Sequence, residues 1–392
     1  MRQLDYPWLL RALALVLALA LATPIVHGVA TARPAVLSAL YGRQIATLPT
    51  AEQALANPWQ ALSQSLAYLS DRTAWVFASS RIVDRVRYDW LGDAASSKLV
   101  RNGAFVFLAR LADTGPLHVI ESACLYGPRA GPDHLIEQSL TVHGALARPD
   151  RRVSFLVIPS KPLLYAERLP VAVPKALRAH CRTTLDTNPL FRPWQEALAE
   201  AGVVGVFPLE RMRGAREQSG YYPAENFHAE GASAFDAAQA LLARLYPDEP
   251  MLQAPLKRVR ARADLEFILR HPRWIERLEP DYGARRARPD RERARALAAA
   301  HPELRGAQVF TAEGEGRAVV IGSSFSTYLA PHLAVRFGET IRVNIEALPV
   351  AEHARALGPV LDALDADEVI FVHHDTGIID GGYGILTNAL TR

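Results

Sequence analysis

The stretch Val319-Val320-Ile321-Gly322-Ser323-Ser324-Phe325-Ser326 decides the fold. Its apolar first half predicts a buried strand that ends at Gly322, and the residues after it predict the start of a helix. In open α/β sheets such a turn lies at the carboxyl edge, where these folds place their functional sites. Backbone N–H groups at the start of the helix are suited to hold an oxyanion, but serine also commonly caps helices. The pattern alone therefore leaves two interpretations of Ser323 and Ser324, a nucleophile or a helix cap.

Similar alternation of short apolar runs and amphipathic stretches extends over most of the chain. Continuously apolar strands with helices between them are typical of a parallel sheet covered on both faces. We therefore expect the α/β class, with a doubly wound, mostly parallel sheet. The expected strands are residues 104–108, 153–158, 203–207, 318–321, 341–345 and 369–372, and the expected helices are residues 51–69, 134–146, 194–201, 232–245, 324–337 and 351–364.

The N-terminus is typical of a membrane-targeting segment. Arg2 precedes an apolar run, and the stretch from Ala12 to Val26 carries no charge. This order suits a signal peptide or an uncleaved signal anchor, and with its flanks the run is just long enough to span a bilayer. We expect residues 1–32 to form this segment, residues 33–95 a helical lead-in that begins the exported part, and residues 96–392 the main domain.

Composition limits the possible function classes. Of the 392 residues, 49% are hydrophobic and 22% are charged, which is typical of a globular protein. The net charge of +3 is too small to argue for nucleic-acid binding. Residues 257–305 differ, with 14 Lys/Arg against 8 Asp/Glu, so 14 − 8 gives +6. This segment is either a solvated helical insertion or a basic surface for an anionic polymer or a lipid headgroup, with Arg285 in its Arg-rich part.

The two cysteines are Cys124 and Cys181. In an oxidising compartment they are able to pair, and otherwise both are buried thiols. The chain has no C-x-x-C motif and no Cys/His cluster, so we expect no zinc site. The group His373-His374-Asp375 follows an expected strand and is a weaker candidate for a metal site or for an acid in catalysis.

A serine nucleophile needs a base, and His228 is the candidate. It lies in the segment Tyr221-Tyr222-Pro223-Ala224-Glu225-Asn226-Phe227-His228, just ahead of an expected helix. Glu225 precedes the histidine by three residues, a spacing that lets one loop orient the imidazole through its second nitrogen.

Together these segments resemble the SGNH-type O-acetyltransferases of the AlgJ/AlgX family. In that family an Asp-x-His motif precedes a Gly-Asp-Ser-Phe-Ser motif by around a hundred residues, and here His228 precedes Ser324. The stretch from Val157 to Tyr165, with the Leu-Pro that follows, is similar to the family's strand-Pro-Ser-Lys element. Residues 103–108 are similar to its Gly-x-x-x-Leu-Phe element. The resemblance covers roughly residues 85–375 and is nearer to AlgJ, because no carbohydrate-binding module follows.

Two motif aspartates of that family are replaced here. The Gly-Asp-Ser motif reads Gly322-Ser323-Ser324, and the Asp-x-His motif reads Asn226-Phe227-His228. Glu225, or else Asp375, is then the expected substitute for the acid. The retained serine and histidine favour an enzyme, whereas the missing aspartates favour a non-catalytic protein that binds or scaffolds polysaccharide.

The resemblance implies a periplasmic O-acetyltransferase that acts on an exported polysaccharide through an acetyl-enzyme on Ser324, without a cofactor. His228 would be the base, Glu225 or Asn226 the position of the acid, and Ser323, Tyr222 and Arg285 substrate-binding residues. It also implies that a membrane-bound O-acyltransferase delivers the acetyl group and that the N-terminal helix anchors the chain in the inner membrane. A carbohydrate esterase is the alternative enzyme, because water hydrolyses the same intermediate.

Overall fold

The computed structural model describes residues 47–72, 74–111, 114–125, 131–269, 272–344 and 352–376. The chain divides into two compact units, residues 1–95 and residues 96–392. The expected signal segment lies outside the described residues. No helix within the described ranges is long and apolar enough to cross a membrane.

The described part of the first unit is helical, with α3 (Ala51–Ala56), α4 (Pro58–Arg72) and α5 (Ala74–Asp89). The sequence predicts one helix over residues 51–69, but the structure breaks it at Asn57. The reason is Pro58, which lacks a backbone N–H and is therefore favoured as the first residue of a new helix.

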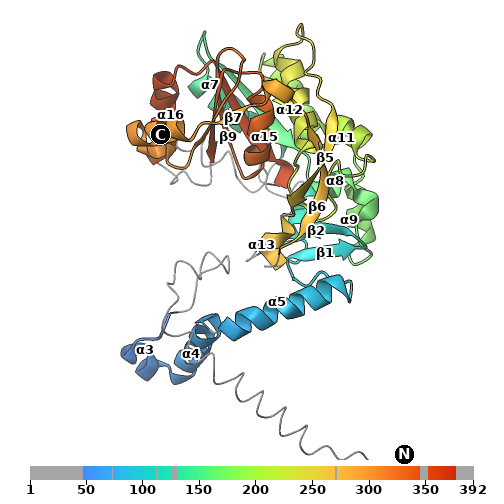
Figure 1. Ribbon diagram of the computed structural model, residues 1–392, viewed down its shortest axis with the longest axis vertical. Coiled ribbons are helices and arrows are strands. Elements are labelled where there is room, and N and C mark those ends of the chain that lie inside the picture. The colour runs from blue at the N-terminus through green and yellow to red at the C-terminus, as the bar shows by residue number, and fades with distance from the viewer. Residues whose placement is uncertain are drawn as a thin grey trace, which may run out of the picture. The chain divides into compact units, whose positions relative to one another are not determined.

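The second unit contains a seven-stranded sheet in the order β4-β3-β11-β9-β10-β8-β7. Two of its strands, β9 and β7, are labelled in Figure 1. The five strands from β4 to β10 are parallel, and β8 and β7 are added antiparallel at one edge. The expectation of a mostly parallel sheet is therefore confirmed. The strands are β3 (Arg152–Ile158), β4 (Val204–Val206), β7 (Arg288–Pro289), β8 (Gln308–Thr311), β9 (Arg317–Gly322), β10 (Glu339–Asn344) and β11 (Glu368–His374).

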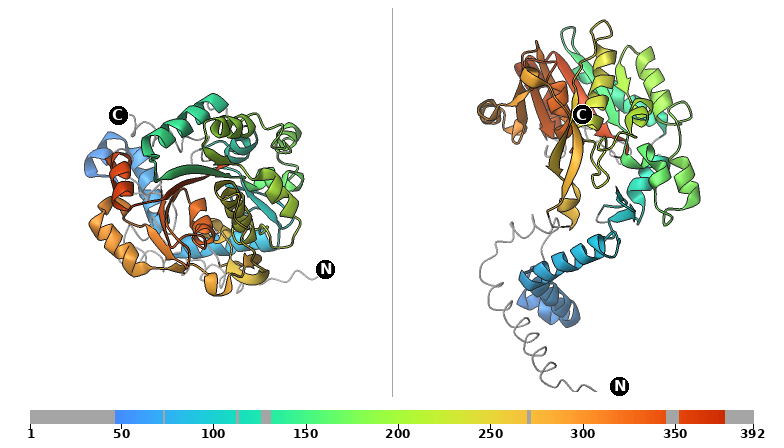
Figure 2. Two further views of the ribbon diagram at one scale, coloured as in Figure 1. Left: turned by 90° about the horizontal axis from the view of Figure 1, so that it is seen from above. Right: turned by 45° about the vertical axis from the view of Figure 1, so that its right-hand side comes forward.

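Helices cover both faces of this sheet (Figure 2). On one face α12 (Ala232–Leu245) and α15 (Phe325–Leu333) pack against each other, and on the other α7 (Pro132–Leu146) packs against α10 (Phe191–Glu200). The sequence predicts these four helices, although α15 ends earlier than the expected residue 337. Other helices in the described part of this unit are α6 (His118–Leu125), α8 (Lys161–Leu164), η1 (Ala166–Arg168), α9 (Lys175–His180), α11 (Leu209–Ala215), η2 (Gly283–Arg285), α14 (Arg291–Ala300), η3 (Pro302–Leu304) and α16 (Glu352–Ala363).

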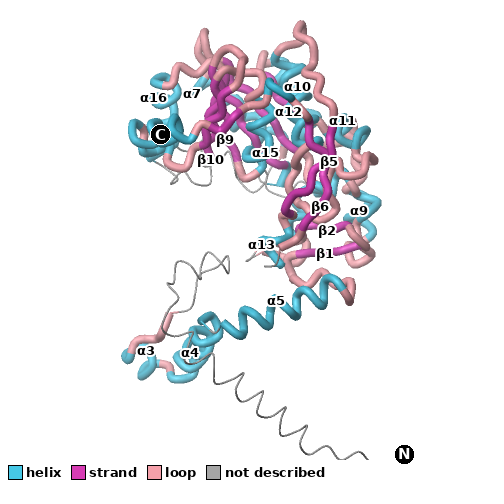
Figure 3. The backbone as a smooth tube through the Cα atoms, viewed as in Figure 1, coloured by secondary structure: helices cyan, strands magenta, loops and turns pink. Residues whose placement is uncertain are grey.

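Among the residues that the structure describes, two strand pairs lie outside the main sheet (Figure 3). One is β1 (Leu99–Asn102) with β2 (Phe105–Leu108), so the expected strand at 104–108 belongs to a separate hairpin. The other is β5 (Leu256–Arg262) with β6 (Trp274–Pro280), which are joined through α13 (Leu265–Leu269). We call β5, α13 and β6 the hairpin arm.

The hairpin arm corrects the interpretation of residues 257–305 as a helical insertion. Its first strand reads Lys257-Arg258-Val259-Arg260-Ala261-Arg262, and these side chains are mostly exposed. After the arm the chain forms η2 (Gly283–Arg285) and β7, and only then the helix α14. The strands β5 and β6 carry five of the 14 Lys and Arg residues of this segment, so part of its basic charge lies on a two-stranded ribbon and not on a helix.

Cys124 and Cys181 form a disulfide that ties the end of α6 to the residue after α9. Of the two possibilities that the sequence left open, a bond or two free thiols, the structure shows the bond. The two residues are 57 positions apart, so the bond closes a long loop in the main domain.

Candidate active site

Ser324 lies where β9 ends and α15 begins, as the sequence predicts. The turn requires glycine at position 322, because a Cβ there would lie 2.1 Å from the carbonyl oxygen of Val372 on the neighbouring strand β11. On the other side Arg342 donates to the hydroxyl of Ser326 at 2.8 Å and to the carbonyl of Ser323. These contacts fix the turn, and Ser324 remains partly accessible to solvent.

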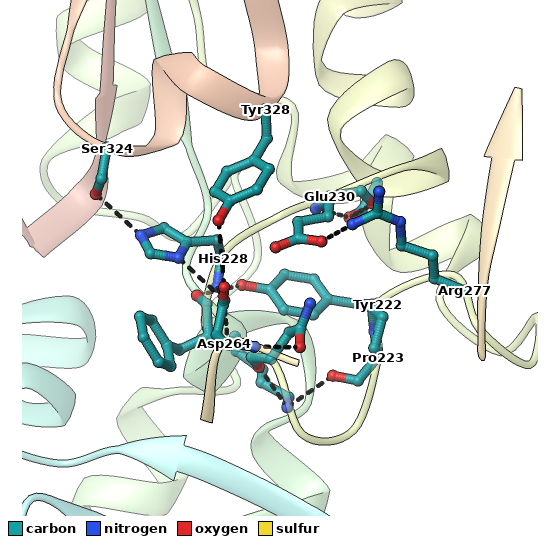
Figure 4. A network of polar contacts seen from close by, with 12 residues as sticks. Tyr222, Pro223, His228, Glu230, Asp264, Arg277, Ser324 and Tyr328 are labelled. Atoms are coloured by element: carbon teal, nitrogen blue, oxygen red, sulfur yellow. Dashed lines mark hydrogen bonds and ion pairs between the residues drawn. The ribbon is translucent and has the colours of Figure 1, made fainter. Parts of the chain in front are cut away.

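His228 contacts this serine. Its Nε2 lies 2.9 Å from Ser324 Oγ (Figure 4). The imidazole packs against three aromatic rings, with centroid distances of 4.7 Å to Phe227, 4.8 Å to Phe325 and 5.2 Å to Tyr328. The ring is therefore held in the orientation that directs one nitrogen at Ser324 Oγ.

The carboxylate in contact with His228 is that of Asp264. Its Oδ2 lies 3.0 Å from His228 Nδ1 and accepts the backbone N–H groups of His228 and Phe227 at 2.9 and 3.1 Å. Burial raises the pKa of this carboxyl, but the hydrogen bonds and charge of His228 outweigh that effect and lower it below its ordinary value. An ionised Asp264 accepts the Nδ1–H, which leaves Nε2 free to accept the Ser324 proton. The three side chains form a Ser-His-Asp arrangement.

The structure places Asp264, and not the expected Glu225, against His228. The candidate Glu225 is occupied elsewhere, since both of its carboxylate oxygens accept from Arg273 at 2.6 and 2.7 Å. Asn226 has a supporting role, because its Oδ1 accepts the backbone N–H of Asp264 at 3.0 Å. Asn226, which stands where the motif has its aspartate, thus holds the backbone of Asp264 in place.

Sequence reasoning missed Asp264 because it lies 36 residues after His228, in the turn between β5 and α13. The alternation of charged and small residues in β5 is a signal that would have predicted the strand. No motif marks the aspartate that follows it.

The other candidate acid, Asp375, lies at the end of β11. Its oxygens accept the backbone N–H groups of Ser160 and Thr376, both at 2.8 Å, and burial raises its pKa to about 7. His374 stacks on Phe325 at 4.7 Å. Within the described ranges no group of three or more His, Cys, Asp or Glu residues is arranged to hold a metal ion.

The three expected substrate-binding residues lie in different surroundings. Ser323 is 5% exposed, and its backbone N–H donates to Val372 on β11. Tyr222 is 3% exposed and its hydroxyl donates to the carbonyl of Phe227 at 2.6 Å, so it supports the loop that carries His228. Arg285 lines a separate cavity of about 330 Å³ and donates to the carbonyl of Gln253. Ser323 therefore lies beside Ser324 with its side chain buried, and Tyr222 lies behind the loop of His228, whereas Arg285 lines a cavity that neither Ser324 nor His228 lines.

Lys161, from the Pro-Ser-Lys element, binds the backbone of residues 221–228, which we call the histidine loop. It is 2% exposed, and its Nζ lies 2.6 to 3.1 Å from four backbone carbonyl oxygens, those of Val106, Pro223, Ala224 and Asn226. Burial lowers its pKa to about 7, against the raising effect of the Asp264 and Glu225 charges. One buried ammonium group thus joins β2 to the segment directly before His228.

A basic cleft of about 610 Å³ lies beside the arm, where β5 and β6 meet β7 and the end of α15. Its charged lining residues are Lys257, Arg260, Arg277, Arg286 and Arg288 against Glu279 and Asp281. With five cations and two anions the lining carries an excess of three positive charges, a field that attracts anions.

We compared the chain with known proteins. No protein-family model and no curated protein matches it, whereas eleven chains of solved structures do. Bacillus cereus PatB1 with a sulfonyl adduct is 15% identical, with a TM-score of 0.47, over 73% of this chain and 97% of that chain. The O-acetyltransferase domain of Pseudomonas putida AlgJ is 14% identical, with a TM-score of 0.43, over 75% and 99%. Pseudomonas aeruginosa AlgX is 11% identical, with a TM-score of 0.42, over 74% and 66%. The solved structures that this chain is similar to therefore include AlgJ and AlgX, the family whose motifs its sequence resembles.

Proposed function

We propose that this chain is an O-acetyltransferase that forms an acetyl-enzyme on Ser324. The observation that carries the proposal is the continuous contact from Ser324 Oγ through His228 to the buried carboxylate of Asp264. A solvated histidine near a serine is common, but a histidine joined to a serine on one side and to a buried carboxylate on the other is the arrangement that acyl transfer needs.

In the first half-reaction Ser324 Oγ attacks the carbonyl carbon of the acetyl donor while His228 Nε2 takes the hydroxyl proton. The imidazolium that forms is stabilised by Asp264. Backbone N–H groups at the start of α15 stabilise the negative oxygen of the tetrahedral intermediate. When the bond to the donor breaks, His228 returns the proton to the leaving group and the acetyl ester of Ser324 remains.

The second half-reaction is the same chemistry in reverse. His228 takes the proton of an acceptor hydroxyl, whose oxygen attacks the acetyl carbonyl, and Ser324 leaves with the proton from His228. A sugar hydroxyl as acceptor gives O-acetyl transfer, and water gives esterase activity. The contact of Asp264 with His228 also weakens the argument for a non-catalytic scaffold, because it offers a carboxylate in place of the motif aspartate that this chain lacks.

The acceptor that we propose is an exported polysaccharide, on the strength of the motif resemblance. The apolar segment from Ala12 to Val26 supports an inner-membrane anchor with the main domain in the periplasm. The Cys124–Cys181 disulfide supports an oxidising compartment. A membrane-bound O-acyltransferase is the proposed source of the acetyl group.

The test uses the full-length chain purified in detergent, with 4-nitrophenyl acetate as donor. We expect turnover by the wild type, an acetylated Ser324 peptide in quenched samples, and neither in Ser324→Ala. Adding acidic and neutral oligosaccharides then separates the two enzymes, because a transferase yields acetylated sugar and an esterase yields only acetate. An equally inert wild type and Ser324→Ala would refute the enzyme.

Location is tested separately with a phosphatase reporter fused after Arg392, which is active only outside the cytoplasm. We expect an active fusion. An inactive phosphatase fusion together with an active cytoplasmic reporter at the same position would contradict export.

A further inference from the structure

The side chain of Tyr328 contacts two members of the Ser-His-Asp arrangement (Figure 4). Its hydroxyl lies 3.3 Å from Asp264 Oδ1, and the centroid of its ring lies 5.2 Å from that of His228. Tyr328 belongs to α15, the helix that begins directly after Ser324. One side chain of this helix therefore touches both the histidine and the aspartate.

Helix geometry accounts for the position of Tyr328. Ser324 already has helical backbone angles, with φ −50° and ψ −31°, and Tyr328 follows it by four residues. Side chains four residues apart lie one above the other on the same face of a helix. The face of α15 that presents Ser324 to His228 thus also presents Tyr328 to Asp264. Since Asp264 lies in the hairpin arm, this hydrogen bond joins the arm to the helix next to the nucleophile.

The two carboxylate oxygens of Asp264 have different partners. Oδ2 accepts from His228 Nδ1 and from the backbone N–H groups of His228 and Phe227, whereas Oδ1 faces the hydroxyl of Tyr328. A carboxylate that accepts three N–H groups is ionised, and an ionised carboxylate has no proton to give. The hydroxyl of Tyr328 is therefore the donor of this hydrogen bond.

A donor on Oδ1 restricts how the carboxylate of Asp264 can turn. The last torsion of an aspartate side chain is broad, and a carboxylate oxygen accepts hydrogen bonds over a wide range of directions. The donors on Oδ2 thus fix the place of that oxygen but leave the tilt of the carboxylate plane loosely set. The hydroxyl of Tyr328 holds the other oxygen, which fixes the plane relative to His228.

We propose that Tyr328 is a positioning residue whose hydroxyl holds Asp264 Oδ1, so that Oδ2 stays directed at His228 Nδ1. The inference rests on the proposed Ser-His-Asp mechanism. The hydroxyl acts through Asp264, whereas the packing of the ring against His228 does not require the hydroxyl. Loss of the hydroxyl should therefore matter while Asp264 is present and should not matter once Asp264 is removed.

The experiment is a double-mutant cycle on the full-length chain in detergent, with the wild type, Tyr328→Phe, Asp264→Ala and the double variant. One rate is kcat/KM for 4-nitrophenyl acetate, with Ser324→Ala as the blank. The other is the rate at which phenylmethylsulfonyl fluoride sulfonylates Ser324, followed by mass spectrometry. Sulfonylation measures the reactivity of the serine without requiring acetyl transfer. Circular dichroism checks that all four proteins are folded.

Tyr328→Phe keeps the ring and removes the hydroxyl. We expect both rates to fall by about tenfold, because a hydrogen bond to a charged group is lost. In the Asp264→Ala background the same change should alter both rates by less than about twofold, since no carboxylate is left to hold. Equal losses in the two backgrounds would mean a role in packing and would overturn the inference. A Tyr328→Phe protein within about twofold of the wild type would also overturn it.

Tyr246→Phe is the matched control. Tyr246 also donates its hydroxyl to a buried carboxylate, Glu368 Oε1 at 3.0 Å. Glu368 is the first residue of β11, which runs parallel to β9, so this pair lies at the opposite end of the sheet from Ser324. Both rates should stay within about twofold of the wild type. A loss equal to that of Tyr328→Phe would reveal a general effect of removing a buried hydroxyl and would overturn the inference.

The two rates also separate this role from the acetyltransferase itself. Sulfonylation with the expected coupling between Tyr328 and Asp264, but without acetyl-ester turnover, would support the role of Tyr328 and refute the acetyltransferase. Acetyl-ester turnover without that coupling would support the acetyltransferase and overturn the inference. A wild type that neither turns over the ester nor is sulfonylated at Ser324 would overturn both.

Discussion

The variant Asp264→Asn tests how the acid of the site works. In serine proteases the equivalent change lowers the rate by about 10⁴, because the histidine then takes the wrong tautomer. Here two backbone N–H groups, those of Phe227 and His228, point at the same oxygen that faces Nδ1. An asparagine at this position therefore directs its carbonyl oxygen toward them, since its NH₂ group would meet two donors. Nδ1 keeps its proton, and the correct tautomer survives.

What the variant loses is the negative charge opposite the imidazolium. Two unit charges about 4 Å apart interact by about 4 kcal/mol at an effective dielectric constant of 20, and exchanging a charged for a neutral acceptor costs at least about 1 kcal/mol. A loss of about 1 to 4 kcal/mol in the transition state corresponds to a fall in kcat of about 10 to 10³. We therefore expect Asp264→Asn to be impaired less than the protease precedent, and Asp264→Ala, which also frees the ring, to be impaired more.

Steady-state turnover of 4-nitrophenyl acetate with single-turnover acetylation of Ser324 provides the assay, and far-ultraviolet circular dichroism checks folding. If Asp264→Asn retains activity within threefold of the wild type, the acid is another residue. If its activity falls by the full 10⁴ of the protease case, the argument that the backbone N–H groups orient the amide is wrong.

Asn226→Asp is the companion variant. The motif alone favours a gain of activity, but in the structure this change adds a carboxylate next to Asp264, so we expect a loss.

Three further predictions follow from charges and covalent bonds. Replacing both cysteines of the 57-residue disulfide loop by serine should lower the free energy of unfolding by about 4 kcal/mol in urea titrations; an unchanged midpoint contradicts this. Burial lowers the pKa of His332 to about 3, so the stability it permits is complete above its unfolded pKa of about 6.5 and is lost as the pH falls below it. Between about pH 6 and pH 4 the wild type should therefore lose about 1.4 kcal/mol more stability per pH unit than His332→Gln does, and equal slopes for the two proteins would refute the argument. Binding of a polyuronate to the basic cleft should weaken steeply with salt and with Arg286→Ala plus Arg288→Ala, whereas Arg285→Ala, in a separate cavity, should have little effect; affinity that is insensitive to salt contradicts a charged site.

The sequence predicts the parts of the molecule that local patterns encode. Apolar runs such as Val319 to Ile321 predict the buried strands, and the turn after Gly322 predicts the position of the nucleophile. The arm was misread because a count of charges ignores their spacing, whereas the alternation in β5 has the period of a strand. Asp264 was missed for a different reason, since its role depends on a tertiary contact with the histidine loop. Glu225 has the right spacing in sequence, but Arg273, also on the arm, engages its carboxylate.

The site is divided between the main body and the arm, so turnover should depend on whether the arm remains folded against the body. Ser324 and His228 belong to the main body, whereas Asp264 is carried by a ribbon whose first strand is mostly exposed. Gly231 and Gly220 lie where the ribbon meets the body, and a Cβ on Gly231 would lie 2.1 Å from the carbonyl oxygen of Leu278. Elements with few buried contacts open at lower free energy than the core. We therefore expect mild heat or denaturant to abolish turnover while the sheet is still folded, with amide exchange in the arm rising at the same point.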